Sequence, residues 1–249
     1  MAKKEPLIVY WAPHDQNFGE ETKRWNLMYA EPTNLFSDLM KQKTKESKDI
    51  SWLSCPAVSD RLKHTFVFKN NVKTTVHWDV TDPLDEYVQV EKYGLNCMIP
   101  RPAVIEDTAM LWFFVGWLFF CEEPVIAHLQ VPYMHRPGYT SKGIIVPGGY
   151  DISSWFRKIN AEMHMWDAKG SMTIEEDEPL IYLEIITDRP IIFKRFVVTE
   201  DIAQYDTACV ESPSYFGRHL PLVDRYKRFR ETRTHEILAK HIKNNLVGE

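Results

Sequence analysis

Residues 109–121 read AMLWFFVGWLFFC, a run of 13 residues that carries no charge. The run is too short for a membrane-spanning helix, which needs about 20 apolar residues. Aromatic and β-branched side chains are typical of strands, and a continuous apolar run bounded by acidic residues is typical of a buried one. The run therefore predicts a buried strand, with Trp112, Phe114 and Leu118 or their neighbours in the core.

The composition of the whole chain also favours strands. Of its 249 residues 13% are aromatic, and 15 prolines outnumber 10 glycines, a balance that suggests aromatic-rich strands joined at proline-marked turns. Apolar residues make up 44% and charged residues 26% of the chain, close to the average of globular domains. These fractions exclude a disordered chain.

Alternating apolar and polar residues predict further strands on either side of this run. Residues 74–80 and 125–131 alternate with the two-residue period of a strand that is buried on one face. Residues 179–187 and 190–198 are apolar runs joined by a two-residue link, which is typical of antiparallel neighbours. The glycines of Pro147-Gly148-Gly149 predict a turn. Strands with such short connections favour antiparallel sheets.

These patterns predict a mainly β fold, an antiparallel β-sandwich of the jelly-roll type, in a single domain that spans 1–249. The sandwich itself is expected over 65–198. Residues 1–64 are expected to hold a short strand and a short N-terminal helix, and residues 218–245 a basic C-terminal helix.

Two segments outside the predicted sandwich follow a helical period. Asn34 precedes apolar residues at 3–4 spacing, which predicts a helix from about 35 to 47 with Asn34 as its cap. Residues 221–244 predict an imperfect amphipathic helix, interrupted at Arg233 and Thr234. The side chains expected to dock this second helix are Leu222, Tyr226, Phe229 and Ile237.

Charge is distributed unevenly along the chain. Residues 218–243 hold eight basic and three acidic residues, a local charge of +5, so with a net charge of −5 the remaining residues carry −10. We expect the basic helix to meet an acidic surface, either on the protein's own body or on a second copy. The overall acidity argues against nucleic acid as a partner, because phosphate contacts normally come from a basic domain.

Cysteine usage and the N-terminus predict a soluble, cytoplasmic protein without membrane association. The apolar run at 7–11 is too short for the core of a signal peptide. The cysteines form no C-x-x-C pair and are far sparser than in small secreted domains, so reduced and mostly buried thiols are expected. They are Cys55, Cys97, Cys121 and Cys209.

Several catalytic motifs are missing from the sequence. It contains no G-x-x-x-x-G-K-[ST] phosphate loop, no dinucleotide G-x-G-x-x-G, no G-x-S-x-G nucleophile elbow and no H-E-x-x-H zinc helix. The first hypothesis is therefore a non-catalytic protein that acts by binding another protein, without a cofactor.

Histidines on strand-like segments support an alternative hypothesis, a cupin-like enzyme with an Fe or Mn centre. Glu162 and His164 are two residues apart, so in a strand they share a face, and His77 and His128 lie at polar positions of their own strands. If the fold brought these faces together, the imidazoles and the carboxylate could hold a divalent metal, as in non-haem iron sites. The competing interpretation is half-exposed strand residues bonded to neighbours.

An exposed aromatic and basic patch is a second candidate for binding. Trp155 and Phe156 lie beside Arg157 after a turn, where aromatic rings could stack on a partner. Packing in the core is the competing interpretation for these rings. Basic candidates for binding on the C-terminal helix are Arg228, Arg230 and Arg233.

Five stretches carry a resemblance to a known family: 53–58, with its Cys-Pro-Ala, 65–69, 132–133, 138–140 and 146–157, with its Pro-Gly, Asp-Ile and Trp-Phe-Arg. Together they resemble an uncharacterised family of roughly 240-residue proteins of tailed-phage and bacterial genomes, a size typical of one domain. The resemblance implies a phage-related origin and a single domain, and it implies no activity. A role in the virion, in phage assembly or in host takeover is the expectation, through a protein partner or self-association, in the host cytoplasm or the virion.

Overall fold

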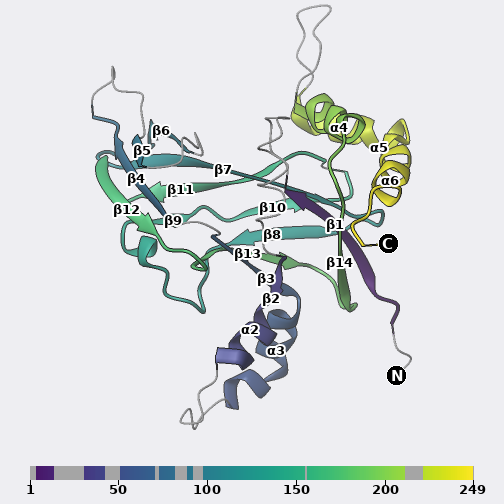
Figure 1. The fold of residues 1–249 in the computed structure, drawn as a ribbon, viewed down its shortest axis with the longest axis horizontal. Helices are drawn as coiled ribbons and strands as arrows, with labels where there is room; N and C mark the ends of the chain where they lie inside the picture. The colour runs from purple at the N-terminus through teal and green to yellow at the C-terminus, as the bar shows by residue number, and fades with distance from the viewer. Residues whose placement is uncertain are drawn as a thin grey trace, which may run out of the picture.

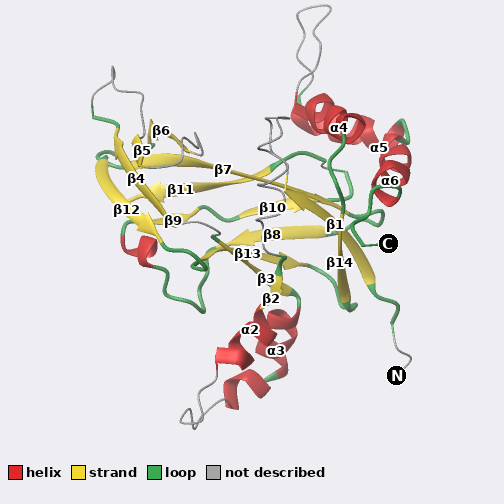
Figure 2. Cartoon of the chain, viewed as in Figure 1, coloured by secondary structure: helices red, strands yellow, loops and turns green. Residues whose placement is uncertain are grey.

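The computed structural model describes residues 4–13, 31–42, 51–70, 73–81, 89–91, 98–154, 156–210 and 221–248. Within these residues the fold is mainly β, with antiparallel sheets at its centre and helices at two separate places outside them (Figure 2). The mainly β prediction is therefore confirmed. None of the helices described is both long and apolar enough to cross a membrane.

The largest sheet has six strands in the described residues, in the order β14-β1-β7-β11-β9 with β6 also paired to β7 (Figure 1). Its strands are β1 (Leu7–Pro13), β6 (Met98–Pro102), β7 (Ala109–Phe120), β9 (Gly143–Ile145), β11 (Ile159–Met165) and β14 (Ile191–Arg195).

Two smaller sheets complete the described β structure. The five-stranded sheet has the order β10-β8-β13-β3-β2 and the three-stranded sheet the order β12-β4-β5. The strands of the former are β2 (Thr33–Asn34), β3 (Thr65–Lys69), β8 (Ile126–Gln130), β10 (Gly148–Asp151) and β13 (Pro179–Ile185). Those of the latter are β4 (Thr74–Asp79), β5 (Gln89–Glu91) and β12 (Lys169–Ile174).

The uncharged run that the sequence singles out forms β7, the longest strand described, so the prediction of a strand is confirmed. Leu118 is fully buried, as predicted, whereas the side chains of Trp112 and Phe114 lie outside the description. Gly116 adopts a φ of 65°, where glycine is favoured, and it lies opposite a register shift between Ile159 and Ala161 of β11. The glycine therefore lets this long strand pass a bulge.

One continuous core joins the three sheets. Phe68 of the five-stranded sheet lies with its ring centroid 4.7 Å from Trp117 and 5.5 Å from Phe119 of β7, and Val76 and Trp78 of the three-stranded sheet belong to the same cluster. Edge-to-face and tilted contacts of this kind are the favoured geometries of aromatic pairs. These aromatic side chains therefore fill the space between the sheets.

The predicted alternation in the two one-sided strands is confirmed. In β4 the side chains of Val76 and Trp78 are buried while Thr75 and His77 are half-buried. In β8 and its flanks, Val125, Ala127 and Leu129 are buried, whereas Ile126 and His128 are exposed. Each of these strands therefore has one face on the core.

The predicted pairing of 179–187 with 190–198 is wrong. These residues contain β13 and β14, which lie in different sheets: β13 pairs with β3 and β8, whereas β14 pairs with β1 in parallel. The short link between them crosses from one sheet to the other, and β1 from the N-terminal segment is an inner strand of the largest sheet. The β structure therefore starts before residue 65.

The predicted glycine turn is also wrong, because Gly148 and Gly149 lie within β10. Gly149 pairs with His128 of β8, and a Cβ at Gly149 would lie 3.1 Å from the His128 ring. These glycines therefore permit close approach of a neighbouring side chain instead of a reversal of the chain.

Five helices lie outside the sheets in the part of the chain that is described. They are α2 (Leu35–Gln42), α3 (Pro56–Lys63), α4 (Glu200–Val210), α5 (Leu222–Glu231) and α6 (Thr234–Lys243), with 3₁₀ turns at Ser51–Ser54 and Gly138–Ser141. Asn34 caps α2, since its Oδ1 accepts a hydrogen bond from the N–H of Ser37 at 3.1 Å. The cap is confirmed, but α2 ends at Gln42 and residues 43–50 lie outside the description. The helix α3, with Pro56 at its first turn, was not predicted.

The C-terminal segment forms two helices that cover the outer face of β1 and β7, with α4 beside them. Arg233 has a φ of 58° and separates α5 from α6, so the predicted interruption is confirmed. Tyr226 and Phe229 are buried as expected, but Ile237 is 49% exposed, and its prediction as a docking residue is wrong. The register of α6 differs from the expected one, because the buried residues of this helix are Leu238, Ala239 and Ile242.

We expect the substitution Phe68→Ala to destabilise the protein by about 3–5 kcal/mol, because it removes a ring that contacts both Trp117 and Phe119 in the shared core. Urea unfolding followed by tryptophan fluorescence measures this change. The control is Ile192→Ala, which removes a side chain that is 45% exposed and should change the stability by no more than about 0.5 kcal/mol. Equal effects of the two substitutions would show that the sheets do not share a packed core.

Candidate functional site

The four residues predicted as metal ligands lie in three different sheets. His77 is on β4, His128 is on β8, and Glu162 and His164 are on β11. The structure therefore keeps only the pair on β11 together. In the part of the chain that is described, no three His, Cys, Asp or Glu side chains lie close enough to hold a metal ion.

The predicted aromatic patch is not a surface feature at Phe156. This side chain is fully buried between the rings of Phe120, at 6.1 Å, and Phe196, at 6.5 Å. Arg157 is half-buried, and Trp155 lies outside the described residues. The prediction that Phe156 binds a partner is therefore wrong, because the ring fills the space between β7 and the helices.

The three predicted arginines of the C-terminal helices differ in their surroundings. Arg230 donates a hydrogen bond to the Ser153 hydroxyl at 2.9 Å and so faces the body of the protein. Arg233 forms a two-pronged pair with Glu236, at 2.8 and 2.7 Å. Arg228 is exposed on α5. Only part of this basic group therefore meets the protein's own surface.

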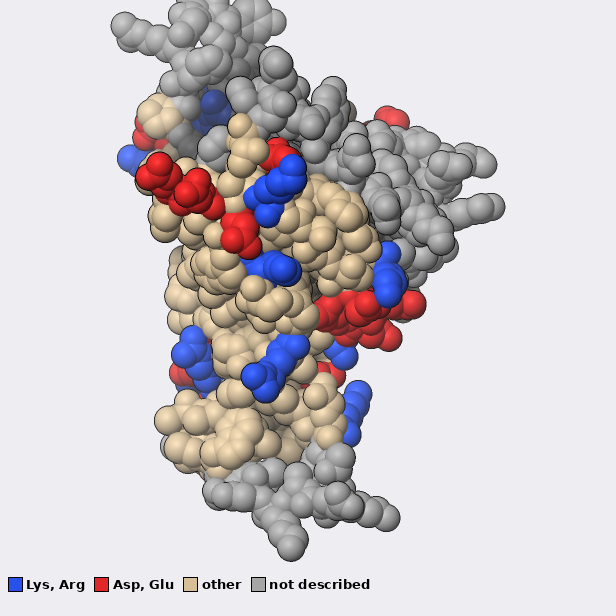
Figure 3. All heavy atoms as spheres, turned by 90° about the vertical axis from the view of Figure 1, so that its left-hand side faces the viewer, with Lys and Arg blue, Asp and Glu red and all other residues tan. Residues whose placement is uncertain are grey.

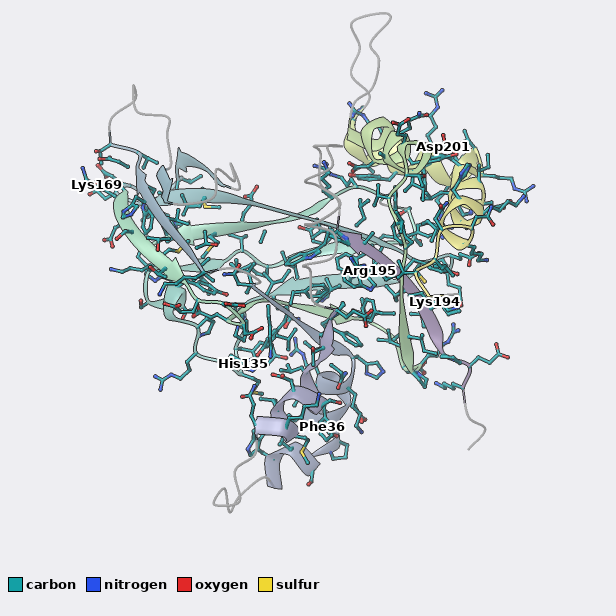
Figure 4. The ribbon with its side chains drawn as sticks, in the orientation of Figure 1. Phe36, His135, Lys169, Lys194, Arg195 and Asp201 are labelled. Atoms are coloured by element: carbon teal, nitrogen blue, oxygen red, sulfur yellow. The ribbon has the colours of Figure 1, made fainter. Side chains whose placement is uncertain are left out.

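A polar network that the sequence did not reveal lies where α2 and α3 pack on the five-stranded sheet (Figure 4). The buried carboxylate of Asp38 is 3.1 Å from His135 Nε2 and 3.2 Å from Lys69 Nζ, and it accepts a hydrogen bond from Gln42 at 2.8 Å. The other ring nitrogen of His135 bonds to the hydroxyl of Tyr182. Four segments of the chain are thus joined through one carboxylate and one imidazole.

Electrostatics define the protonation states of this network. Burial raises the pKa of Tyr182, so its hydroxyl keeps its proton, and this hydroxyl shares a hydrogen bond with Nδ1 of His135. Burial also lowers the pKa of His135, against the opposing influence of Asp38. The carboxylate, imidazole and phenol could pass a proton in principle, but Tyr182 is fully buried and its oxygen already accepts backbone N–H groups of Met134 and His135. The network therefore has a structural role, since it holds α2 against β3 and β13 of the five-stranded sheet.

A signal for this network exists in the sequence, since Asp38 and Gln42 occupy positions one turn apart on the apolar side of α2, which also carries Leu35. A carboxylate at such a position requires a buried partner. The partner His135 lies 97 residues away and in a loop, so the spacing along the chain could not identify it.

We expect the stability of the protein to fall as the pH drops below about 6.5, the ordinary pKa of histidine, because the unfolded chain binds a proton at His135 that the folded protein resists. The opposing groups around this ring are Asp38, which favours its charge, and Lys69, which disfavours it. Thermal unfolding between about pH 7.5 and pH 5, a range that brackets the ordinary histidine pKa of 6.5, measures the effect. His135→Gln should flatten the pH dependence, and His128→Gln, at an exposed position, should not; identical profiles for all three proteins would contradict the assignment.

Two exposed apolar side chains lie at one end of the largest sheet, in the loop that joins β6 to β7. Val104 is fully exposed and Ile105 is 59% exposed. The loop is held by a hydrogen bond from the Thr108 hydroxyl to the Ile105 carbonyl at 2.6 Å and by one from the Ala103 N–H to the Thr108 carbonyl at 3.2 Å. Asp107 closes the loop with a φ of 57°. The two apolar side chains are therefore presented on an ordered loop.

Trp166, which is 46% exposed, lies at the same end of the largest sheet, directly after β11. His164 links the two segments, because its Nε2 lies 3.0 Å from the Thr108 hydroxyl and its ring centroid 5.6 Å from that of Trp166. The register agrees, since β11 ends beside the start of β7. We call Val104, Ile105 and Trp166 the apolar tip.

The surroundings of the apolar tip are mainly acidic, with one exposed lysine, Lys142, whose carbonyl accepts a hydrogen bond from the Trp166 N–H at 2.8 Å. Glu106 and Asp107 follow the two apolar residues of the loop, and Asp167 follows Trp166. The nearby Lys169 is paired with Asp79, and this hydrogen bond is the main reason why the pKa of Asp79 is lowered to about 2. Figure 3 faces this end of the molecule, where acidic side chains gather in two groups and Lys or Arg side chains lie between and beside them.

Two cysteine side chains are described, Cys121 and Cys55. Burial raises the pKa of Cys121 to about 11, so its thiol is inert at neutral pH. Cys55 is free and exposed, which corrects the expectation of buried thiols at this position, and Cys97 lies outside the described residues.

Comparison with protein-family models gives no match for this chain, and a search of curated proteins gives none either. The predicted resemblance to a phage-type family is therefore without support from these comparisons. Function is therefore inferred from the surfaces described above, the apolar tip in particular.

Proposed function

We propose that this protein acts by binding another protein through the apolar tip. The observation that carries the proposal is the exposure of three large apolar side chains, Val104, Ile105 and Trp166, at one end of the largest sheet. Single exposed apolar residues are ordinary, whereas a group of them with a polar rim is typical of a protein interaction site.

The order of the loop supports binding over accidental exposure. The side-chain and backbone hydrogen bonds of Thr108 and the left-handed conformation of Asp107 hold the loop in one shape. A preorganised loop loses little conformational entropy when it binds, so more of the contact energy appears as affinity. Tryptophan, the third member of the tip, is a residue type that often dominates binding energy at interfaces.

The architecture that we propose for the body is a β-sandwich in one domain. It is supported by the core that the six-stranded and five-stranded sheets share and by the helices outside them. A jelly-roll order of strands is part of the same proposal.

The setting that we propose is phage assembly, the virion or host takeover. Its support is the resemblance of residues 53–58 and 146–157 to a phage-type family. Such a setting suits a protein whose most prominent surface feature is a small apolar contact site.

We expect a photoreactive phenylalanine analogue in place of Ile105 to form a covalent adduct with one discrete protein when cells that make the protein are irradiated. The same analogue in place of Ile186, which directly follows β13 and is 48% exposed, is the control and should give no such adduct. Val104→Ser in the presence of the photoreactive residue should weaken the adduct. Absence of an adduct from position 105, or the same adduct from both positions, would reject the apolar tip as a binding site.

A further inference from the structure

The C-terminal helices carry a surface whose charge is opposite to that of the apolar tip. Residues 227–243 contain six basic and two acidic residues. Two of these cations face the body: Arg230 bonds to Ser153, and Lys243 pairs with Glu122 at 2.8 Å. Arg228 and Lys240 remain exposed on the outer side of α5 and α6.

An exposed apolar residue lies near these cations. Ile237 is 49% exposed, and helical spacing places it one turn from Lys240. Arg233 precedes the first turn of the same helix and is paired with Glu236, the residue before Ile237. The end of α5 lies beside this part of α6, because the ring of Phe229 is 6.4 Å from that of His235. We call Arg228, Arg233, Ile237 and Lys240 the basic helical face.

The basic helical face and the apolar tip lie at opposite ends of the molecule. In Figure 1 the helices α5 and α6 lie at the end of the sheet where β1 and β14 pair, whereas β6, β12 and the start of β7 lie at the other end. Lys169, three residues beyond Trp166, marks the tip end in Figure 4, far from Asp201 on α4. One chain therefore cannot bring its own tip to its own basic helical face.

We infer that the partner of the apolar tip is the basic helical face of a second copy of this chain, so that copies associate head to tail; this inference rests on the proposed function. The two surfaces carry opposite charge, and each has an exposed apolar component. The tip has exposed apolar side chains beside Glu106, Asp107 and Asp167, and the basic helical face has an exposed isoleucine near Arg228 and Lys240. Since the two surfaces differ, the contact is heterologous and leaves one free tip and one free face at the ends of every assembly.

A second acidic cluster at the tip end lacks the apolar component. Residues 175–178 form a turn of four acidic residues, and Glu175 is already paired with Lys73 at 2.8 Å. Charge alone would be screened beyond about 8 Å at physiological salt. The combination of apolar and acidic side chains therefore selects the tip over this turn as the partner of the basic helical face.

Two double variants test the inference, one for each surface. The tip variant carries Ile105→Ser and Glu106→Lys, and the helix variant carries Arg228→Glu and Lys240→Glu. All four positions are exposed, so the melting temperatures of both variants should equal that of the wild type. Matched charge controls are Glu176→Lys on the second acidic cluster and Lys63→Glu on α3.

Sedimentation velocity at rising protein concentration and low salt should show that the mass of the wild type and of both controls increases without a fixed limit. Each double variant should stay monomeric, with a dissociation constant raised by about tenfold or more. An equimolar mixture of the two double variants should form a discrete heterodimer, because only the intact tip of one and the intact face of the other can meet. High salt should weaken every one of these associations.

The inference is overturned if the wild type stays monomeric at low salt, if either double variant still assembles, or if the mixture gives no heterodimer. These failures are separable from failure of the proposed function. An adduct from position 105 with a different protein, together with a monomeric wild type, would overturn the second-copy partner and leave the tip as a binding site. A monomeric wild type without any adduct would overturn both.

Discussion

The fold depends on one constraint, which is that β7 is apolar on both of its faces and needs cover on both. Trp117 and Phe119 face the core shared with the five-stranded sheet, whereas Leu118 and Phe120 face the C-terminal helices. A strand of this kind leaves apolar area in water if either cover is missing, at about 25 cal/mol for each Å². The pairing of sheets on one side and the helical cap on the other are two answers to the same requirement.

The strand periods could be predicted from the sequence because they report local contact with water. In β4 and β8 the polar positions face outward and the apolar ones face the core, and both patterns were interpreted correctly. The partners of strands could not be predicted in the same way. β13 and β14 are joined by a short link, but they pair in different sheets, with strands that are distant in the sequence.

Helix register was predictable only where the apolar stripe is regular. Tyr226 and Phe229 were predicted as buried and are buried. In α6, however, Ile237 and Leu238 are adjacent apolar residues, and the left-handed residue Arg233 resets the helix so that Leu238 faces inward. The sequence holds no local signal for that choice, because either residue could start the stripe.

The exposure of the apolar tip could not be predicted from the sequence. Val104 and Ile105 are a pair of apolar residues between two strands, which are as typical of buried structure as of a loop, and their exposure follows from the hydrogen bonds of Thr108 and the conformation of Asp107. Glu162 and His164 were interpreted as metal ligands. The structure places them half-buried on the face of β11 opposite Ala161 and Met163.

The helices α4, α5 and α6 cover only one end of the largest sheet, and this explains why the apolar tip and the basic helical face are so far apart. The helices pack over Leu118 and Phe120, at the end of β7 that pairs with β1. On the same face nearer the start of β7, β11 presents Glu162 and His164, which do not form a continuous apolar surface for a helix to cover. Since the cap provides stability at one end and the loop side chains Val104 and Ile105 are largely exposed, substitutions in this loop are able to change binding while leaving the fold unaffected.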